Sequence, residues 1–255
     1  MLAVPFGLAI GLGLGALGGG GAVLALPVLI YVLGEDVHAA TSSSLLVVAV
    51  AALAGGAAQA SSARVCWPQV AYFAPAALIG AVAGTVAGAA VSETVLLLGF
   101  VPVLMAAALL TWRRAGASGD EGGGCPPLDR DRTLVAGLAV GLLTGFFGVG
   151  GGFLIVPMLA LTMRFPLRRA IGTSLVIVGF VSLVALSAHL VRDQAFDAGT
   201  AAALALACAV GAVGGARLAE RVPQRRLGHA FAVLLGAVGA YIAIATAIMG
   251  GPPGA

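Results

Sequence analysis

Long apolar blocks separated by short polar stretches dominate this chain of 255 residues. Most of the blocks have close to the ~20 residues that a helix needs to cross the hydrocarbon core of a bilayer. There are four in each half of the chain, at about 3–33, 39–60, 69–90, 94–112, 133–162, 170–190, 198–218 and 228–249. The pattern predicts an all-α polytopic membrane protein.

The two halves repeat one motif in a constant register, in which Gly15 corresponds to Gly145 and Pro27 to Pro157. Glycine clusters closed by a proline occur as GALGGGGAVLALP at 15–27 and as GFFGVGGGFLIVP at 145–157. In the same register, residues 40–45 align with 170–175. A duplicated apolar half that is interrupted by glycines is typical of a secondary transporter.

Composition supports the same class of protein. Hydrophobic residues make up 60% of the chain and charged residues only 9%, whereas soluble domains carry about 25% charged residues. The stretch at 115–131 is rich in glycine, proline and charge, which indicates a flexible surface loop. We therefore expect a first membrane repeat at 1–114, a cytoplasmic linker at 115–131 and a second membrane repeat at 132–255.

The arginines predict the orientation in the membrane, because the chain contains no lysine. If all eight blocks cross the bilayer, the thirteen arginines divide almost equally between its two sides, against the positive-inside rule. If the blocks at 3–33 and 133–162 are instead re-entrant hairpins that turn at their glycines, only Arg192 lies apart from the other twelve. Each repeat then has a broken or re-entrant hairpin plus three transmembrane helices. An odd number of crossings makes the two repeats inverted and both termini extracytoplasmic.

The glycine clusters are candidates for a binding site. Backbone N–H groups at membrane depth cost several kcal/mol each unless protein or water satisfies them. A helix that restarts after each cluster, at about 21–33 and 151–162, would aim its free N–H groups and positive dipole end at the tip of the hairpin. Two such ends balance about one negative charge, so we expect a monoanion. The glycines predicted to bind it are Gly18, Gly20, Gly21, Gly148, Gly150, Gly151 and Gly152.

Close helix packing is the alternative explanation for glycines in membrane helices. At the tips we favour ligand binding, because both clusters are contiguous and both are followed by a proline, which packing does not require. We prefer packing for the glycines in the third block of each half, namely Gly80, Gly84, Gly88, Gly211, Gly214 and Gly215.

Hydroxyl groups follow the clusters in the next block of each half. Ser43 and Ser44 in the first half, and Thr173 and Ser174 in the second, could donate hydrogen bonds to an anion near the tips. A hydroxyl in an apolar helix can equally bond back to a carbonyl of its own preceding turn. The repeat favours the ligand hypothesis, because Ser44 and Ser174 are the same position in the two copies.

Two further polar residues correspond in the register of the repeat and lie near opposite membrane faces. Gln59 and His189 are candidates for proton coupling or gating, since a histidine titrates near neutral pH. The alternative, which we prefer, is that both lie at helix ends and touch headgroups and water. All ten carboxylates fall in or beside loops, so the apolar blocks offer no candidate for a sodium site or a carboxylate proton relay.

The remaining side chains give no sign of catalysis. The three cysteines, Cys66, Cys125 and Cys208, have unrelated spacings, and we expect them to pack as small apolar side chains rather than to form a metal site or a disulfide framework. No histidine, carboxylate or cysteine cluster has metal or triad spacing. The sequence therefore argues against an enzyme and indicates no metal, no cofactor and no nucleic-acid partner.

The glycine clusters with their prolines, the Ala-Ile-Gly-Thr-Ser-Leu motif at 170–175 and the Gly-Ala-Val-x-Gly segments at 80–84 and 211–215 resemble the sulfite exporter TauE/SafE family of membrane permeases. The resemblance covers nearly the whole chain and is closer in the second half. It implies a secondary transporter, specifically an exporter, of small sulfur-containing anions such as sulfite or organosulfonates across the bacterial inner membrane. The expected partners are that anion and the lipid bilayer, and no oligomeric state is predicted. An anion channel or facilitator for another small anion is the alternative.

Overall fold

The computed structural model describes residues 3–21, 37–88, 91, 93–117, 124–147, 152–190 and 198–249. Within these residues the chain forms nine α-helices and one short 3₁₀ helix, with no strand. The helices are α1 (Ala3–Leu17), η1 (Gly18–Gly21), α3 (Val37–Ser61), α4 (Trp67–Gly88), α5 (Glu93–Ala117), α6 (Arg130–Phe147), α7 (Gly152–Thr162), α8 (Leu167–Leu190), α9 (Ala198–Arg221) and α10 (Gln224–Met249). The predicted all-α fold is confirmed.

Each apolar block of the sequence corresponds to one helix or to a broken pair of helices. Among the described residues, five helices are long and apolar enough to cross a membrane, namely α3, α4, α8, α9 and α10. In α5, which has 25 residues, the apolar described part is Gly99–Arg113. Several helices continue past their apolar blocks, as α5 does to Ala117 and α9 to Arg221. Long arginine side chains allow this, because they reach headgroups and water from a helix end.

The two longest blocks are broken, as their glycines predict. α1 has 15 residues and passes into η1, while α6 has 18 residues and is followed by α7 with 11. At 1.5 Å per residue, α1 and α7 are about 22 and 16 Å long, which is less than the ~30 Å of a hydrocarbon core. The helix predicted at 151–162 is α7, and the one predicted at 21–33 lies, apart from Gly21, outside the described residues.

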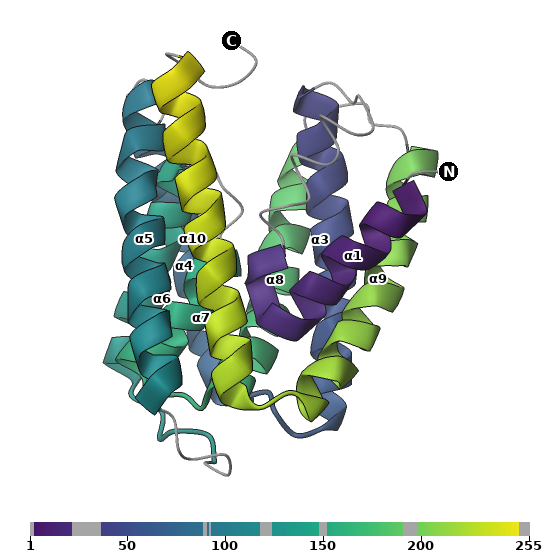
Figure 1. Cartoon of the computed structure of the whole chain (residues 1–255), viewed down its shortest axis with the longest axis vertical. Helices are drawn as coiled ribbons and strands as arrows, with labels where there is room; N and C mark the ends of the chain where they lie inside the picture. Colours follow the sequence, from purple (N-terminus) through teal and green to yellow (C-terminus); the bar gives the residue numbers. More distant parts are fainter. Residues whose placement is uncertain are drawn as a thin grey trace.

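The arginines of the described residues are concentrated at one end of the molecule. In Figure 1, α1 begins and α10 ends toward the upper end, whereas the end of α5, residues 124–129 before α6, and the connections α3–α4, α7–α8 and α9–α10 lie at the lower end. All arginines of the described residues lie in or beside these lower segments, and we call this the arginine-rich end. They are Arg64, Arg113, Arg114, Arg130, Arg132, Arg164, Arg168, Arg169, Arg217, Arg221, Arg225 and Arg226.

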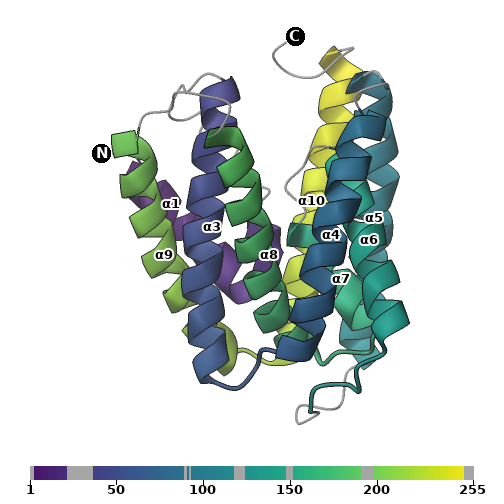
Figure 2. The same ribbon diagram turned by 180° about the vertical axis from the view of Figure 1, so that it is seen from behind.

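The helices form two bundles, which Figure 2 shows from behind. The first bundle contains α1, η1, α3, α8 and α9, and the second contains α4, α5, α6, α7 and α10. Each bundle therefore combines helices from both halves of the sequence. α7 contacts both η1 and α8 and so joins the bundles, and the two sets of ribbons approach each other most closely toward the arginine-rich end (Figures 1 and 2).

Glycines bring α1 and α9 into backbone contact. A methyl group added at Gly11 would overlap the backbone of Cys208, and one added at Gly15 would overlap that of Ala212. Small residues allow helices in membranes to approach this closely. Enlarging either glycine would therefore push α1 away from α9.

The crossing of α6 with α4 is built in the same way. Gly141 and Gly145, which correspond to Gly11 and Gly15 in the repeat, meet the backbones of residues 77 and 81. The expected packing role of glycines in the third blocks is also confirmed for five of them, Gly80, Gly84, Gly88, Gly211 and Gly215. It is wrong for Gly214, where an added methyl group would meet no atom within 4 Å, because this position on α9 faces away from α1.

The outer surface is apolar, as a lipid-facing surface must be. Large side chains such as Ile79 and Val86 on α4, and Leu206 and Val210 on α9, are exposed. On a soluble protein such a surface would be an aggregation hazard, whereas in a bilayer it contacts acyl chains. α8 is the most buried of the five candidate membrane spans and forms the centre of the molecule.

Two of the three cysteines form a disulfide. Cys66, just before α4, is bonded to Cys125, which precedes α6. The expectation that all three cysteines pack as apolar side chains is therefore wrong for this pair. Residues 124–129 fold back against α4 and bring together two residues that are 59 positions apart, which their spacing alone does not reveal. Cys208 does pack as predicted, fully buried where α9 crosses α1.

Candidate functional site

The tip of the first broken segment meets the start of α7. Gly18, the first residue of η1, follows α1 with a φ of +75°, a left-handed conformation that glycine adopts without strain. The turn places Gly19 so close to Gly152, the first residue of α7, that a methyl group on Gly19 would overlap the Gly152 backbone. Glycines of the two halves are thus in direct contact inside the molecule, and only glycine fits at Gly19.

The second turn of α8 lies beside the same tip. A methyl group added at Gly18 would come within 2.7 Å of Ser174 Oγ. Thr173 and Ser174 are both fully buried. The Ser174 hydroxyl donates to the carbonyl oxygen of Ile171 at 2.8 Å, which is the back-bonding that the sequence left open as an alternative.

Thr173 joins α8 to the start of α4. Its Oγ1 accepts a hydrogen bond from the backbone N–H of Cys66 at 3.1 Å, in a buried position. The Cys66 carbonyl in turn accepts from the N–H groups of Gln69 and Val70 in the first turn of α4. Accepting a hydrogen bond leaves the hydroxyl hydrogen of Thr173 for donation elsewhere.

The hydroxyls of the first half lie in α3. Ser43 is fully buried, and its hydroxyl has no hydrogen-bond partner among the described residues. Leaving such a group unpaired costs about 1–3 kcal/mol, so it needs a physical explanation such as a bound ligand or water. Ser44, the next residue, is half-buried.

The remaining predicted glycines divide between the two clusters. Gly20 and Gly21 complete η1. Of the four glycines predicted to bind the anion from the second cluster, the structure describes Gly152, and the other three lie outside the described residues: Gly148, Gly150 and Gly151.

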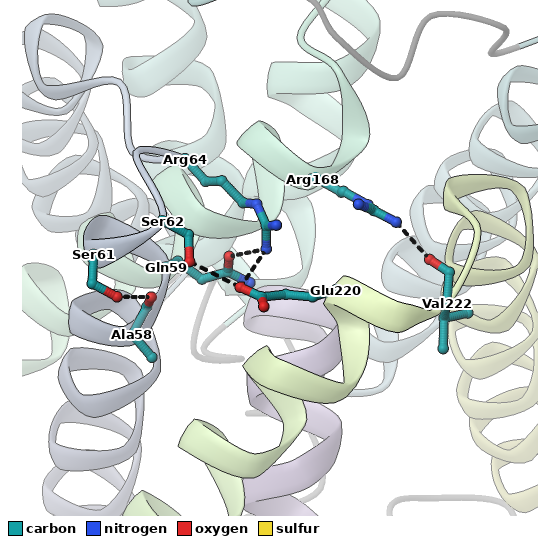
Figure 3. Close-up of polar contacts among 8 residues, drawn as sticks. All are labelled: Ala58, Gln59, Ser61, Ser62, Arg64, Arg168, Glu220 and Val222. Carbon is teal, nitrogen blue, oxygen red and sulfur yellow. Dashed lines mark hydrogen bonds and ion pairs between the residues drawn. The ribbon is translucent and has the colours of Figure 1, made fainter.

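Gln59 belongs to a polar network at the arginine-rich end (Figure 3). Its side-chain oxygen accepts from Arg64 Nη1 at 3.3 Å, and the same nitrogen pairs with Glu220 at 2.9 Å. Ser62 donates to that carboxylate, also at 2.9 Å. The network fastens the end of α3 to the end of α9. Gln59 is only 2% exposed, so the expected contact with headgroups and water is wrong for this residue.

His189 lies in the last turn of α8, at the end of that helix opposite Leu167. Its side chain is outside the described residues. Gln59 and His189 therefore lie toward opposite ends of the molecule, as predicted.

Two residues that the sequence did not single out shape this region. Gly19 belongs to the first glycine cluster, which the sequence analysis marked as a candidate site. The neighbouring glycines belong to that cluster equally, so membership alone did not distinguish Gly19. Cys66 contacts Thr173 through its backbone N–H. Every residue type except proline has this donor, so the sequence gives no signal for the contact.

Comparison with known proteins identifies the family of this chain. The family model described as sulfite exporter TauE/SafE matches residues 3–242, and the chain belongs to this family. A "Probable membrane transporter protein" of Xylella fastidiosa (strain 9a5c) is 36% identical over 177 residues, which cover 69% of this chain and 68% of that protein. A protein of Methanocaldococcus jannaschii with the same description is 33% identical over 60 residues, 24% of this chain and 22% of its own. No solved structure matches the chain.

The family and the names of these relatives indicate a multi-pass membrane transporter rather than an enzyme. The resemblance noted from the glycine clusters is thereby confirmed. Among the described residues, no group of three or more histidine, cysteine, aspartate or glutamate side chains could hold a metal ion.

Proposed function

We propose that this TauE/SafE protein is a secondary transporter that exports a small sulfur-containing monoanion, such as sulfite in its hydrogensulfite form or an organosulfonate, across the bacterial inner membrane. The observation that carries the proposal is the contact between Gly19 and Gly152, which joins the broken segments of the two halves. Several transporter folds build their substrate sites from discontinuous helices that meet near the bilayer midplane.

In this proposal the anion binds at the N-terminus of α7. The first four N–H groups of a helix have no partner within it, and the helix dipole places about half a positive charge there. The helix expected after η1 supplies a second such end, so Gly20 and Gly21 face the ligand together with Gly148, Gly150, Gly151 and Gly152. About one positive charge then balances a monoanion.

Hydroxyls of α8 complete the proposed site. Ser174 lies beside Gly18, but its hydroxyl donates to Ile171, so a bound anion has to draw it away by rotation about χ1. Thr173 keeps its hydroxyl hydrogen available while it accepts from Cys66. A hydrogen bond to a charged ligand contributes about 1.5–3 kcal/mol, so each hydroxyl has a measurable share in affinity.

Movement of the two bundles would expose the site alternately to the two sides. At the arginine-rich end, Thr173 accepts from Cys66, and Arg169 donates to the carbonyl oxygen of Ala63 at 3.0 Å. Both contacts hold α8 against the connection between α3 and α4. They close the site toward that end and have to break before it opens there.

The packing supports inverted repeats. α1 starts toward the upper end and α6 at the lower end (Figure 1), and each crosses a helix of the other half through glycines at corresponding positions of the repeat. By the positive-inside rule, the arginine-rich end is cytoplasmic. Both termini are then extracytoplasmic.

The test is a ligand titration on detergent-purified protein, read as anion-dependent thermal stabilisation with hydrogensulfite, isethionate and the dianions sulfoacetate and sulfate. The monoanions hydrogensulfite and isethionate should stabilise the protein more than the two dianions do. Ser174→Ala should weaken sulfonate binding by about 1.5 kcal/mol, which is about tenfold.

Ser187→Ala is the matched control, because Ser187 lies on the same helix and donates to the carbonyl oxygen of Val184 at 2.7 Å, yet is exposed near the other end of that helix. It should bind as the wild type does. If sulfate bound tightly and Ser174→Ala left its affinity unchanged, the anion would bind at another site. Saturable counterflow in proteoliposomes distinguishes the proposed transporter from a channel.

A further inference from the structure

The disulfide between Cys66 and Cys125 lies at the arginine-rich end, and transport as proposed above does not use it. If that end is cytoplasmic, the disulfide is in a compartment where glutathione and thioredoxin keep thiols reduced. Disulfides that do form there are usually transient and redox-sensing. The position of the pair therefore argues against a permanent structural cross-link.

We propose that Cys66 and Cys125 form a reversible thiol–disulfide pair. When oxidised, the pair fastens the segment before α6, residues 124–129, to the start of α4 at the arginine-rich end. The two sulfurs differ in access. Cys66 is fully buried between α4 and α8, whereas Cys125 is exposed. Cys125 is thus the sulfur that a small reagent reaches first.

The segment that carries Cys125 is already seated on α4. Gln69 Nε2 donates to the carbonyl oxygen of Pro126 at 2.8 Å, and the guanidinium of Arg130 lies 5.6 Å from the centroid of the Tyr72 ring. These contacts hold the segment beside Cys66, so closing the disulfide needs little further ordering of the chain.

The guanidinium of Arg169 lies close enough to Cys125 to favour thiol exchange at its sulfur. Its Nη1 lies 3.4 Å from Cys125 Sγ, and a neighbouring guanidinium favours the thiolate, which is the reactive form. Because Arg169 also donates to Ala63, one side chain of α8 holds both the cysteine segment and the connection between α3 and α4.

A low-molecular-weight disulfide such as oxidised glutathione is the oxidant. The Cys125 thiolate attacks one of its sulfurs, which forms a mixed disulfide and releases one glutathione thiolate. The Cys66 thiolate then attacks Cys125 Sγ, closes the protein disulfide and releases the second. Two protein thiols are oxidised while one small disulfide is reduced to two thiols, and excess glutathione reverses both exchanges.

Oxidation should slow opening at the arginine-rich end. Cys66 N–H holds Thr173, and Arg169 holds Cys125, so the closed disulfide adds a covalent link between two points that contact α8. The oxidised protein is therefore expected to transport more slowly than the reduced protein. This consequence rests on the proposed function, whereas the thiol chemistry does not.

Thiol counting on the full-length protein tests the pair. After an acid quench and denaturation, a maleimide-coupled polymer should label three cysteines in the reduced protein and one, Cys208, in the oxidised protein. Glutathione buffers of different redox poise should interconvert the two forms in inside-out vesicles. A membrane-impermeant reductant should reduce the disulfide there but not in intact cells. One label under every condition, or reduction from outside intact cells, would overturn the proposal.

Limited proteolysis and transport test the lock. A glutamate-specific protease, which can cut this connection after Glu121, should cleave severalfold more slowly in oxidised vesicles than in reduced ones, and Cys125→Ser should remove the difference. Equal cleavage of both forms would overturn the lock. Flux that is the same in both forms would overturn its effect on transport. Absence of flux for every anion tested would count against the proposed function alone, because labelling and cleavage still decide the redox pair.

Discussion

The backbone N–H of Cys66 donates a buried hydrogen bond of 3.1 Å to the hydroxyl of Thr173, across 107 residues of sequence. This bond joins the start of α4 in the second bundle to α8 in the first. Thr173 is next to Ser174, which lies against Gly18. The contact between the two bundles near the arginine-rich end is thereby connected to the candidate site by adjacent residues of one helix.

Thr173→Val should destabilise the folded protein by about 1–3 kcal/mol, because valine keeps the shape but leaves the buried N–H of Cys66 without an acceptor. Thr173→Ser retains the oxygen and should lose much less. Thermal unfolding in detergent, compared with the wild type, measures both. A valine variant as stable as the wild type would mean that the N–H finds another acceptor.

Gly19→Ala and Gly152→Ala should abolish transport, since an added methyl group at Gly19 overlaps Gly152 and one at Gly152 comes within 2.8 Å of the Gly19 Cα. Gly150→Leu and Gly151→Leu should act likewise if their backbones approach the anion. The control is Gly214→Leu, which faces open space on α9 and should transport normally. Flux is compared at matched amounts of folded protein, and normal flux in Gly19→Ala would remove the tip contact from the mechanism.

Gly11→Ala should lower the thermal stability, because the methyl group overlaps the backbone of Cys208 and overpacking of this kind costs about 1–3 kcal/mol. Gly13→Ala changes the same helix by the same atoms but meets nothing within 4 Å. Its stability should be equal to or higher than that of the wild type, because alanine favours a helix over glycine. Equal melting temperatures for both variants would show that the crossing tolerates a wider separation.

Both termini should be extracytoplasmic, because the described arginines gather at the opposite end from the start of α1 and the end of α10. Fusions of a cytoplasmic and a periplasmic reporter to each end measure this in cells. A cytoplasmic signal at either end would contradict the inverted topology, and it would also place the Cys66–Cys125 disulfide outside the cytoplasm.

Local signals in the sequence were enough to predict the helices, the two broken segments and the family. A bilayer requires about 20 consecutive apolar residues per crossing and satisfied backbone groups, so block length and the glycine–proline breaks report directly on the fold. The same locality made Gly18 and Gly152 recognisable as candidates, since each stands in a glycine cluster, and the register of the repeat did so for Ser174, which corresponds to Ser44. These three residues do lie around one point in the structure.

Only the tertiary structure decided which residues meet. Helix rotation turns Gly214 outward and Gly215 inward, although the two are neighbours in sequence. Chain reversal brings Cys66 to Cys125 and buries Gln59 beside Arg64. The two halves exchange helices, so that α1 packs on α9 and α6 on α4. Such contacts depend on how whole helices pack against distant ones, and the identity and spacing of single residues do not encode that arrangement locally.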